Sequence, residues 1–198
     1  MTNFPYFRYE YTHTNDRMWR KTRSKQGRCY GVDPNRNFGY KWGGKGTSNN
    51  PCSDVYKGPT PFSEPELASL RNFIMPQKNQ FVLYLAFHSY GQYILYPWGY
   101  DRIDAQNVKE LHKLGNYGAN AARRYGHRYS VGNSAKLLYP AAGASDDWAM
   151  GGAGIRYSYT IELPDKGTHG FILPTYYIHT VAPGALEMTK AMILHLHE

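Results

Sequence analysis

Apolar residues recur at helical spacing in three segments of the chain. The first follows the sequence Ser63-Glu64-Pro65-Glu66. Its apolar stripe consists of Leu67, Leu70 and Ile74. This pattern predicts a helix with Ser63 as N-cap and Glu66 as its reciprocal capping partner, ending before Pro76. The same spacing predicts helices over 104–124 and 182–197.

Two further segments have the pattern of strands. Residues 80–87 are almost continuously apolar, which predicts a strand buried on both faces within a helix-covered sheet. Residues 155–163 alternate between apolar and polar positions and predict a second strand, with Glu162 near its end. Residues 1–62 contain scattered Gly, Pro and Asn without a sustained period, so we expect loops with short strands there.

Length and composition limit the classes that this chain can belong to. Its 198 residues, of which 41% are hydrophobic and 19% charged, fit one compact domain and exclude collagen-like, coiled-coil and strongly disordered classes. No run of the ~18 apolar residues that a membrane span requires is present, so we expect no membrane partner. Residues 1–8 have neither the charged nor the apolar region of a secretory signal peptide.

The net charge of +8 changes the picture only where basic residues cluster. The cluster comprises Arg17, Arg20, Lys21, Arg23, Lys25 and Arg28. One interpretation is a solvated basic loop. The other is recognition of a carboxylate or phosphate, for which the guanidinium fork is well suited. Composition leaves both interpretations open.

Cys29 and Cys52 flank a segment rich in Gly and Pro. Such a segment has little else to hold it, so we predict a disulfide, which would contribute about 3 kcal/mol in the loop-entropy account. A disulfide implies an oxidising compartment. Two unrelated thiols are the alternative.

His88-Ser89-Tyr90-Gly91-Gln92 follows the first predicted strand directly, at the carboxyl end where open α/β sheets bind ligands. This sequence resembles the third zinc-ligand motif of the pancreatic carboxypeptidase A/B family of metallocarboxypeptidases. The other family motifs appear in order: Met18-Trp19-Arg20-Lys21-Thr22-Arg23, Gly31-Val32-Asp33-Pro34-Asn35-Arg36-Asn37, Cys52-Ser53, Leu138-Tyr139-Pro140-Ala141, Ser145-Asp146-Asp147-Trp148 and Tyr159-Thr160-Ile161-Glu162-Leu163. The resemblance runs from about Glu10 onward. It implies an α/β fold, with a mixed, mostly parallel twisted sheet covered by helices on both faces, here lacking its N-terminal strands.

The resemblance also implies roles for individual residues. A planar Arg fork beside an Asn amide is a natural receptor for a C-terminal carboxylate, and Asn35 and Arg36 have this role in the family pattern. Arg20 corresponds to the group that stabilises the oxyanion, and Glu162 to the general base. The family's zinc ligand is His88. Its substrate contacts are Ser89, Tyr90 and Tyr139, the last a tyrosine that closes over the substrate. Taken singly, a His or Glu at a strand end is more often structural.

Asp146 lies at the position that forms the floor of the side-chain pocket in the family. A buried acid there favours a cationic side chain, so we predict release of C-terminal Lys or Arg. The small residues Gly99 and Ser134 leave room for a long side chain. The alternative is that Asp146 only caps a short helix that begins near Asp147.

The family's other two zinc ligands come from a His-x-x-Glu motif, which the sequence lacks before His88. A catalytic zinc has three protein ligands, so one of three is present. His195-Leu196-His197-Glu198 has this spacing, but it ends a helix at the chain terminus, far from His88 in the sequence, so we do not expect it to bind the zinc. We therefore expect residues 1–198 to be a partial catalytic domain, with 1–9 as an atypical segment and little activity alone.

Two further functions have to be weighed against the zinc-dependent enzyme. The first is a non-catalytic fragment that binds peptide C-termini without cutting them. The second is nucleic-acid binding, which we reject because no nucleic-acid motif accompanies the arginines. The resemblance implies a secreted monomer that acts on peptides with a free C-terminus. Since no signal peptide begins the sequence, we expect a secreted form to be longer.

Overall fold

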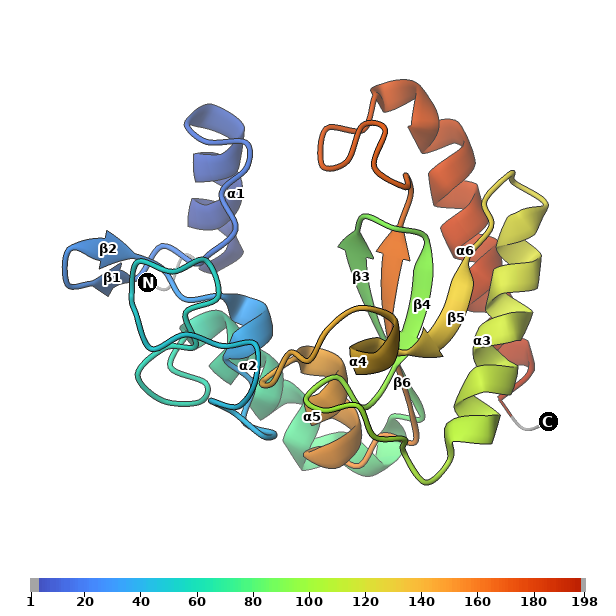
Figure 1. The fold of residues 1–198 in the computed structure, drawn as a ribbon, viewed down its shortest axis with the longest axis horizontal. Coiled ribbons are helices and arrows are strands. Elements are labelled where there is room, and N and C mark those ends of the chain that lie inside the picture. Colours follow the sequence, from blue (N-terminus) through green and yellow to red (C-terminus); the bar gives the residue numbers. More distant parts are fainter. Residues whose placement is uncertain (1–3, 197–198) are drawn as a thin grey trace.

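A mixed four-stranded sheet with the strand order β3-β6-β4-β5 lies at the centre of the molecule (Figure 1). This computed structural model describes residues 4–196, with side chains from residue 9 onward. The strands are β3 (Leu83–Ser89), β6 (Tyr157–Leu163), β4 (Tyr93–Tyr96) and β5 (Ser130–Asn133). β3 and β6 pair in parallel, as do β4 and β5, while β4 and β6 are antiparallel. The predicted mixed, mostly parallel sheet is therefore present.

Helices pack on both faces of this sheet (Figure 1). The long helices α3 (Val108–Arg123) and α6 (Ile178–Leu194) bury Leu111 and Met188 against Tyr159 of β6. On the other face lie α2 (Pro65–Ile74) and α5 (Ser145–Gly151). They form a second apolar cluster around Trp148. The period-2 alternation of β6 explains this division, because successive side chains point to opposite faces.

The remaining elements are short, apart from an N-terminal helix. They are α1 (Phe4–Thr14), β1 (Lys25–Gln26), β2 (Cys29–Tyr30), η1 (Pro34–Arg36), η2 (Met75–Gln80), α4 (Ser134–Leu137) and η3 (Thr175–Tyr177). The prediction of loops over 1–62 was wrong for α1. Aromatic residues are spread through this sequence at Phe4, Tyr6, Phe7, Tyr9 and Tyr11, so it does not show a one-sided helical pattern. A tertiary contact holds it instead, since the Arg23 guanidinium lies 3.7 Å from the Tyr11 ring centre.

The predicted capping box at residue 63 was also wrong. Helix α2 begins at Pro65 with Glu64 in the N-cap position, and no side chain caps it. Glu64 is buried and accepts hydrogen bonds from the hydroxyls of Ser24 (2.8 Å) and Ser63 (3.1 Å). Ser63 is therefore directed to Glu64 rather than to the helix. Pro at the first helical position makes the start favourable without a cap.

The prediction that the 80–87 strand is buried on both faces was wrong as well. β3 is the edge strand and pairs with β6 alone among the described strands. Phe87 is 48% exposed and the neighbouring Val82 is 42% exposed. An apolar run thus identifies a strand but not its place in the sheet, because that place depends on which other strands pair with it.

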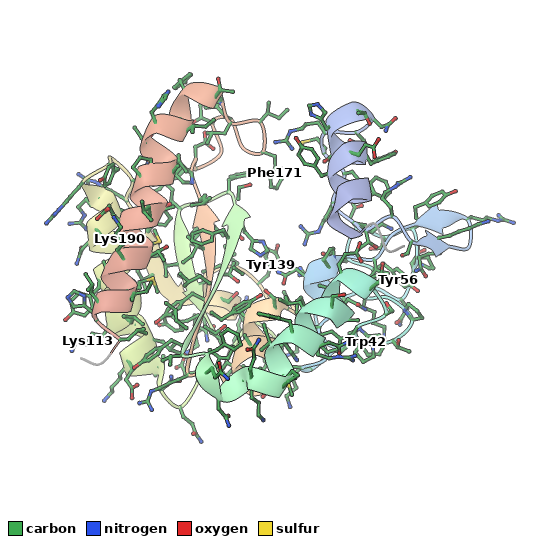
Figure 2. All side chains as sticks on the ribbon, turned by 180° about the vertical axis from the view of Figure 1, so that it is seen from behind. Trp42, Tyr56, Lys113, Tyr139, Phe171 and Lys190 are labelled. Carbon is green, nitrogen blue, oxygen red and sulfur yellow. A yellow bond between two sulfur atoms is a disulfide. The ribbon has the colours of Figure 1, made fainter. Side chains whose placement is uncertain are left out.

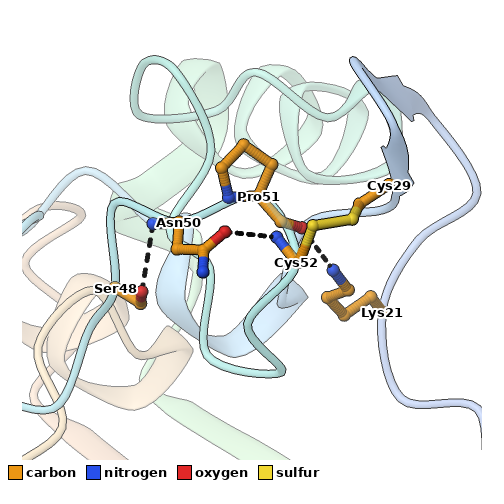
Figure 3. Close-up of a disulfide and its surroundings, with 6 residues drawn as sticks. All are labelled: Lys21, Cys29, Ser48, Asn50, Pro51 and Cys52. Atoms are coloured by element: carbon orange, nitrogen blue, oxygen red, sulfur yellow. Dashed lines mark hydrogen bonds between the residues drawn. A yellow bond between two sulfur atoms is a disulfide. The ribbon is translucent and has the colours of Figure 1, made fainter.

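The predicted disulfide is present and joins β2 to the loop that follows η1 (Figure 3). The Cys29 and Cys52 Cα atoms lie 5.3 Å apart. Beside the bond, the buried Lys21 ammonium donates to the carbonyl of Pro51 at 2.7 Å. Separately, no helix among the described residues is long and apolar enough to cross a membrane.

Candidate active site

A cleft of about 640 Å³ opens between the N-terminal segment and the carboxyl end of β3. Its lining residues are Arg17, Met18, Trp19, Arg20, Pro34, Asn35, Phe38, Asp54, Tyr84, Ala86, Phe87, His88, Ser89, Ser145 and Phe171. Of the predicted site residues, the cleft brings together Arg20, Asn35, His88 and Ser89. Arg17 spans the cleft and donates to the Phe171 carbonyl at 3.2 Å. Phe171 lies at the rim, facing the N-terminal helix (Figure 2).

His88 and Glu162 occupy paired positions on neighbouring parallel strands. Side chains in register on adjacent strands point to the same face of the sheet, so both point to the α5 side, on which the cleft lies. The Glu162 Oε2 atom is buried and has no hydrogen-bond partner. Burial raises the pKa of Glu162 to about 7, and the opposing charge of Arg20 limits this rise. A carboxyl group with a pKa near 7 is suited to accepting and returning a proton at neutral pH.

Arg20 is held in place by a single carboxylate. Its Nε and Nη2 atoms donate to Asp33 Oδ2 at 3.0 and 2.8 Å. Asp33 is almost fully buried, whereas the Arg20 side chain is 43% exposed. The guanidinium is therefore oriented from its buried side and open to the cleft.

Asn35 and Arg36 belong to the short helix η1, whose fixed Pro φ favours the turn. The Asn35 Oδ1 atom accepts a hydrogen bond from the backbone N–H of Ser145 at 2.9 Å. Arg36 is buried, and its Nε and Nη1 atoms donate to the carbonyls of Gly46 (2.9 Å) and Asn35 (2.7 Å). The Asn35 amide is thus fixed against the start of α5, and the Arg36 guanidinium is fixed against the carbonyls of Gly46 and Asn35.

The remaining predicted substrate contacts differ in their placement. The Tyr90 ring packs edge-on against Phe171, with 4.8 Å between the ring centres. Tyr139 is 59% exposed and is not among the residues that line the cleft. It lies on the segment after α4, and Figure 2 shows it between the sheet and the N-terminal part of the chain.

Asp146 and Asp147 are both buried in the first turn of α5. Asp146 Oδ2 has no hydrogen-bond partner, and burial raises the pKa of this carboxyl. The N-cap position of α5 is occupied by Ala144, so Asp146 is not the capping residue. Asp146 does not line the cleft directly, but its neighbour Ser145 does.

The sequence interpretation did not single out Asp147. This carboxylate accepts hydrogen bonds from the backbone N–H groups of Gly99 (2.7 Å) and Tyr100 (2.8 Å). Burial and the neighbouring Asp146 raise its pKa to about 8. A Cβ on Gly99 would lie 3.5 Å from both the Asp147 Oδ2 atom and the Ser134 hydroxyl. Of the two small residues expected to line the pocket, Gly99 therefore lies against Asp147, and Ser134 lies beside Gly99.

Asp33 and Phe171 were also not predicted as site residues. The signal for Asp33 was present, since it lies inside the motif that contains Asn35 and Arg36. Phe171 carries no such signal. It enters the cleft because the loop after β6 is folded by Asp165, which accepts hydrogen bonds from the backbone N–H groups of Gly167 and His169 at 2.8 and 2.7 Å.

The donor atoms of the described residues do not fit a catalytic zinc ion. A hydrolytic zinc site uses three protein ligands, and over residues 4–196 no group of three His, Cys, Asp or Glu side chains could hold a metal. His88 is the one expected ligand. In the His195-Leu196-His197-Glu198 sequence, His195 stacks on Tyr117 at 3.9 Å, on the α3 side of the sheet. Residues 197 and 198 lie outside the described residues.

Comparisons with known proteins agree on one group of relatives. A family model described as zinc carboxypeptidase matches residues 9–188. The chain is 44% identical to carboxypeptidase B of Astacus astacus over 188 residues, which cover 93% of this chain and 62% of that protein. It is 43% identical to carboxypeptidase B of Rattus norvegicus over 193 residues, covering 96% of this chain and 46% of that protein. The chain thus spans between about half and two thirds of the length of these relatives.

A solved structure shows the same similarity in three dimensions. Bovine thrombin-activatable fibrinolysis inhibitor, solved in complex with tick carboxypeptidase inhibitor, superposes with a TM-score of 0.91 at 38% sequence identity. The superposition covers 95% of this chain and 65% of that one.

Proposed function

This chain belongs to the zinc carboxypeptidase family, and we propose that it forms the substrate-recognition part of a metallocarboxypeptidase that releases C-terminal Lys or Arg from peptides. The observation that carries this proposal is the arrangement around the cleft. An oriented guanidinium (Arg20), an amide and guanidinium pair (Asn35 and Arg36) and a carboxyl group with a pKa near 7 (Glu162) come from separate parts of the chain to one side of the sheet.

Each of these groups has a task in binding and cleaving a peptide C-terminus. Asn35 and Arg36 bind the terminal carboxylate, for which a planar fork and an amide supply matched donors. Arg20 stabilises the negative charge that develops on the scissile carbonyl. Glu162 holds a proton at its buried carboxyl group and passes it to the leaving amine. Ser89, Tyr90 and Tyr139 contact the substrate, with Tyr139 moving inward from its exposed position.

The preference for Lys or Arg is assigned to Asp146. Its Oδ2 atom is buried without a partner, and such an atom costs free energy that a cationic ligand group relieves. Peptides that end in Arg should therefore bind better than peptides that end in Phe.

We also propose that the 198-residue chain alone hydrolyses peptides slowly or not at all. Family members are named as zinc enzymes, and the described residues offer one of the three ligands that a catalytic zinc needs. The same observation favours a second candidate function, a protein that binds peptide C-termini without cutting them. Zinc content and hydrolysis of hippuryl-L-arginine, measured with added zinc on a longer form of the chain that supplies further zinc ligands, separate the two candidates, since only the enzyme turns over.

Calorimetric titration of the chain with N-acetyl-L-arginine and N-acetyl-L-phenylalanine tests the recognition function. We expect the arginine compound to bind at least about tenfold more tightly, because a cation would pair with a buried carboxylate. Asp146→Asn should remove this preference while preserving shape. Asp104→Asn, which removes an exposed carboxylate paired with Lys136, is the matched control and should leave it unchanged. Equal affinity of the unmodified chain for both compounds would contradict the assignment of Asp146.

A further inference from the structure

Asp33 contacts both parts of the recognition machinery with one buried carboxylate. Its Oδ2 atom accepts from Nε and Nη2 of Arg20 at 3.0 and 2.8 Å. Its Oδ1 atom accepts from the backbone N–H of Asn35 at 3.1 Å. The side chain is 1% exposed, so water does not compete for either oxygen.

The Oδ1 contact fixes the turn that carries the carboxylate receptor. Asp33 is the N-cap of η1, with extended backbone angles (φ −69°, ψ 112°). Its own N–H donates to the Tyr56 carbonyl at 2.9 Å, which anchors the cap to the surrounding loop. An N-cap oxygen satisfies a donor that the helix itself cannot pair. The position of Asn35 and Arg36 therefore depends on this oxygen.

The Oδ2 contact fixes the direction of Arg20. An arginine side chain on the surface samples many rotamers, and ordering it costs conformational entropy. Two donors on one acceptor oxygen restrict the guanidinium plane before any ligand arrives, and a positioned charge stabilises an oxyanion better than a mobile one. Because Asp33 is buried, loss of Arg20 would leave a buried charge without its cation, which costs free energy.

We infer that Asp33 is a positioning residue that sets the placement of the Arg20 guanidinium relative to the Asn35–Arg36 receptor. It acts through Arg20 on the reacting carbonyl and through Asn35 on the terminal carboxylate. This inference rests on the proposed function, and it adds a residue to which that function had given no role.

Two probes separate the two effects of Asp33. N-acetyl-L-arginine presents the carboxylate and the cationic side chain. A phosphonate analogue of a dipeptide ending in arginine adds a tetrahedral anion at the place of the scissile carbonyl. Asp33→Asn keeps an oxygen for the Asn35 N–H but removes the charge that holds Arg20. We expect it to weaken the phosphonate about tenfold and N-acetyl-L-arginine less than about twofold, in keeping with the usual effect of misplacing one charged group.

Further variants locate the effect. Asp33→Ala, which also loses the cap, should weaken both probes. Arg20→Gln should weaken the phosphonate, and adding Asp33→Asn to it should have no further effect if Asp33 acts through Arg20. Asp104→Asn is the control for loss of a carboxylate. Thermal unfolding of each variant shows whether it is folded. If Asp33→Asn unfolds, Arg20→Lys replaces it in the test, because lysine keeps the positive charge but cannot make the planar contact with Asp33.

The outcomes distinguish this inference from the proposed function. If the unmodified chain binds neither probe, the proposed function and the inference both fail. If the chain binds both probes and Asp33→Asn (or, where that variant unfolds, Arg20→Lys) leaves phosphonate binding unchanged, the inference alone fails. An equal loss from Asp33→Asn with and without Arg20 would also overturn it, because the effect would then not pass through the guanidinium.

Discussion

At the scale of single residues, two carboxyl groups that are costly to bury lie on the side of the sheet on which the cleft opens. Glu162 and Asp146 each have a buried oxygen without a partner. Protein interiors rarely leave such atoms unsatisfied. Their presence on one side of the sheet agrees with the ligand site proposed above, and it makes two pH effects measurable.

The first effect concerns stability. The pKa of Glu162 is about 7 in the folded protein and near 4.5 in the unfolded chain. Between these values the folded state binds more protons, so stability falls as pH rises through this window. We expect Glu162→Gln, which stays neutral, to be more stable than the unmodified chain at pH 8, by on the order of 3 kcal/mol at most. The two proteins should be about equally stable near pH 4. Urea unfolding of the metal-free proteins across this range measures the difference, and parallel curves would contradict it.

The second effect concerns selectivity. Burial raises the pKa of Asp146, so its carboxyl group is neutral at low pH and ionises as pH rises. Only the ionised form attracts a cation, so the preference for N-acetyl-L-arginine over N-acetyl-L-phenylalanine should increase with pH. The ratio of the two affinities, measured between pH 5 and 9, checks this. A ratio that does not change with pH would show that Asp146 is not the selective group.

At the scale of elements, helix α1 depends on a contact with the β1–β2 hairpin. The Arg23 guanidinium lies over the rings of Tyr11, Trp19 and Tyr30, at 3.7, 4.5 and 4.8 Å from their centres. Cation–π contacts of this kind contribute roughly 0.5 to 2 kcal/mol each. This cluster joins the helix to Tyr30 of the hairpin.

Arg23→Ala should therefore loosen α1 without unfolding the sheet. We expect amide hydrogen exchange over residues 9–14 to become roughly tenfold faster, while exchange in β6 stays unchanged. Arg28→Ala removes an exposed arginine from the same hairpin and serves as the control. Unchanged exchange in Arg23→Ala would mean that other contacts, such as those between α1 and α2, hold the helix.

At the scale of the whole molecule, the free side of β3 is the most exposed part of the sheet. An edge strand presents unpaired backbone groups, and natural proteins commonly protect such edges with charges or Pro. From Leu83 to Ser89 the strand contains no Lys, Arg, Asp, Glu or Pro. The family resemblance implies a monomer, but this edge favours association at high concentration.

Val82→Lys places a charge beside that edge. We expect the unmodified chain to show an average mass that increases with concentration in light scattering, and the variant to show a smaller increase. Ile103 is similarly exposed, at 47%, but lies away from β3, so Ile103→Lys is the control. A mass independent of concentration in the unmodified chain would contradict the prediction.

The sequence by itself determined the class of fold, the disulfide and the candidate site residues. Periodicity predicted the individual strands and helices, and the ordered motifs, through the family that they resemble, implied the fold and the roles proposed for the site residues. Predicted elements over 104–124, 155–163 and 182–197 correspond to α3, β6 and α6 with small shifts at their ends.

Only the tertiary structure decided how these parts meet. Helix α1 is held by Arg23, which comes from a later segment of the chain. Ser63 does not cap α2, because its hydroxyl donates to Glu64, which also accepts a hydrogen bond from Ser24 in a buried contact. The exposure of β3 depends on which strands lie beside it, and the role inferred for Asp33 depends on Arg20 folding back over it. In each case the deciding interaction joins separate segments of the chain, and its free energy exceeds the weak local preference that a sequence pattern records.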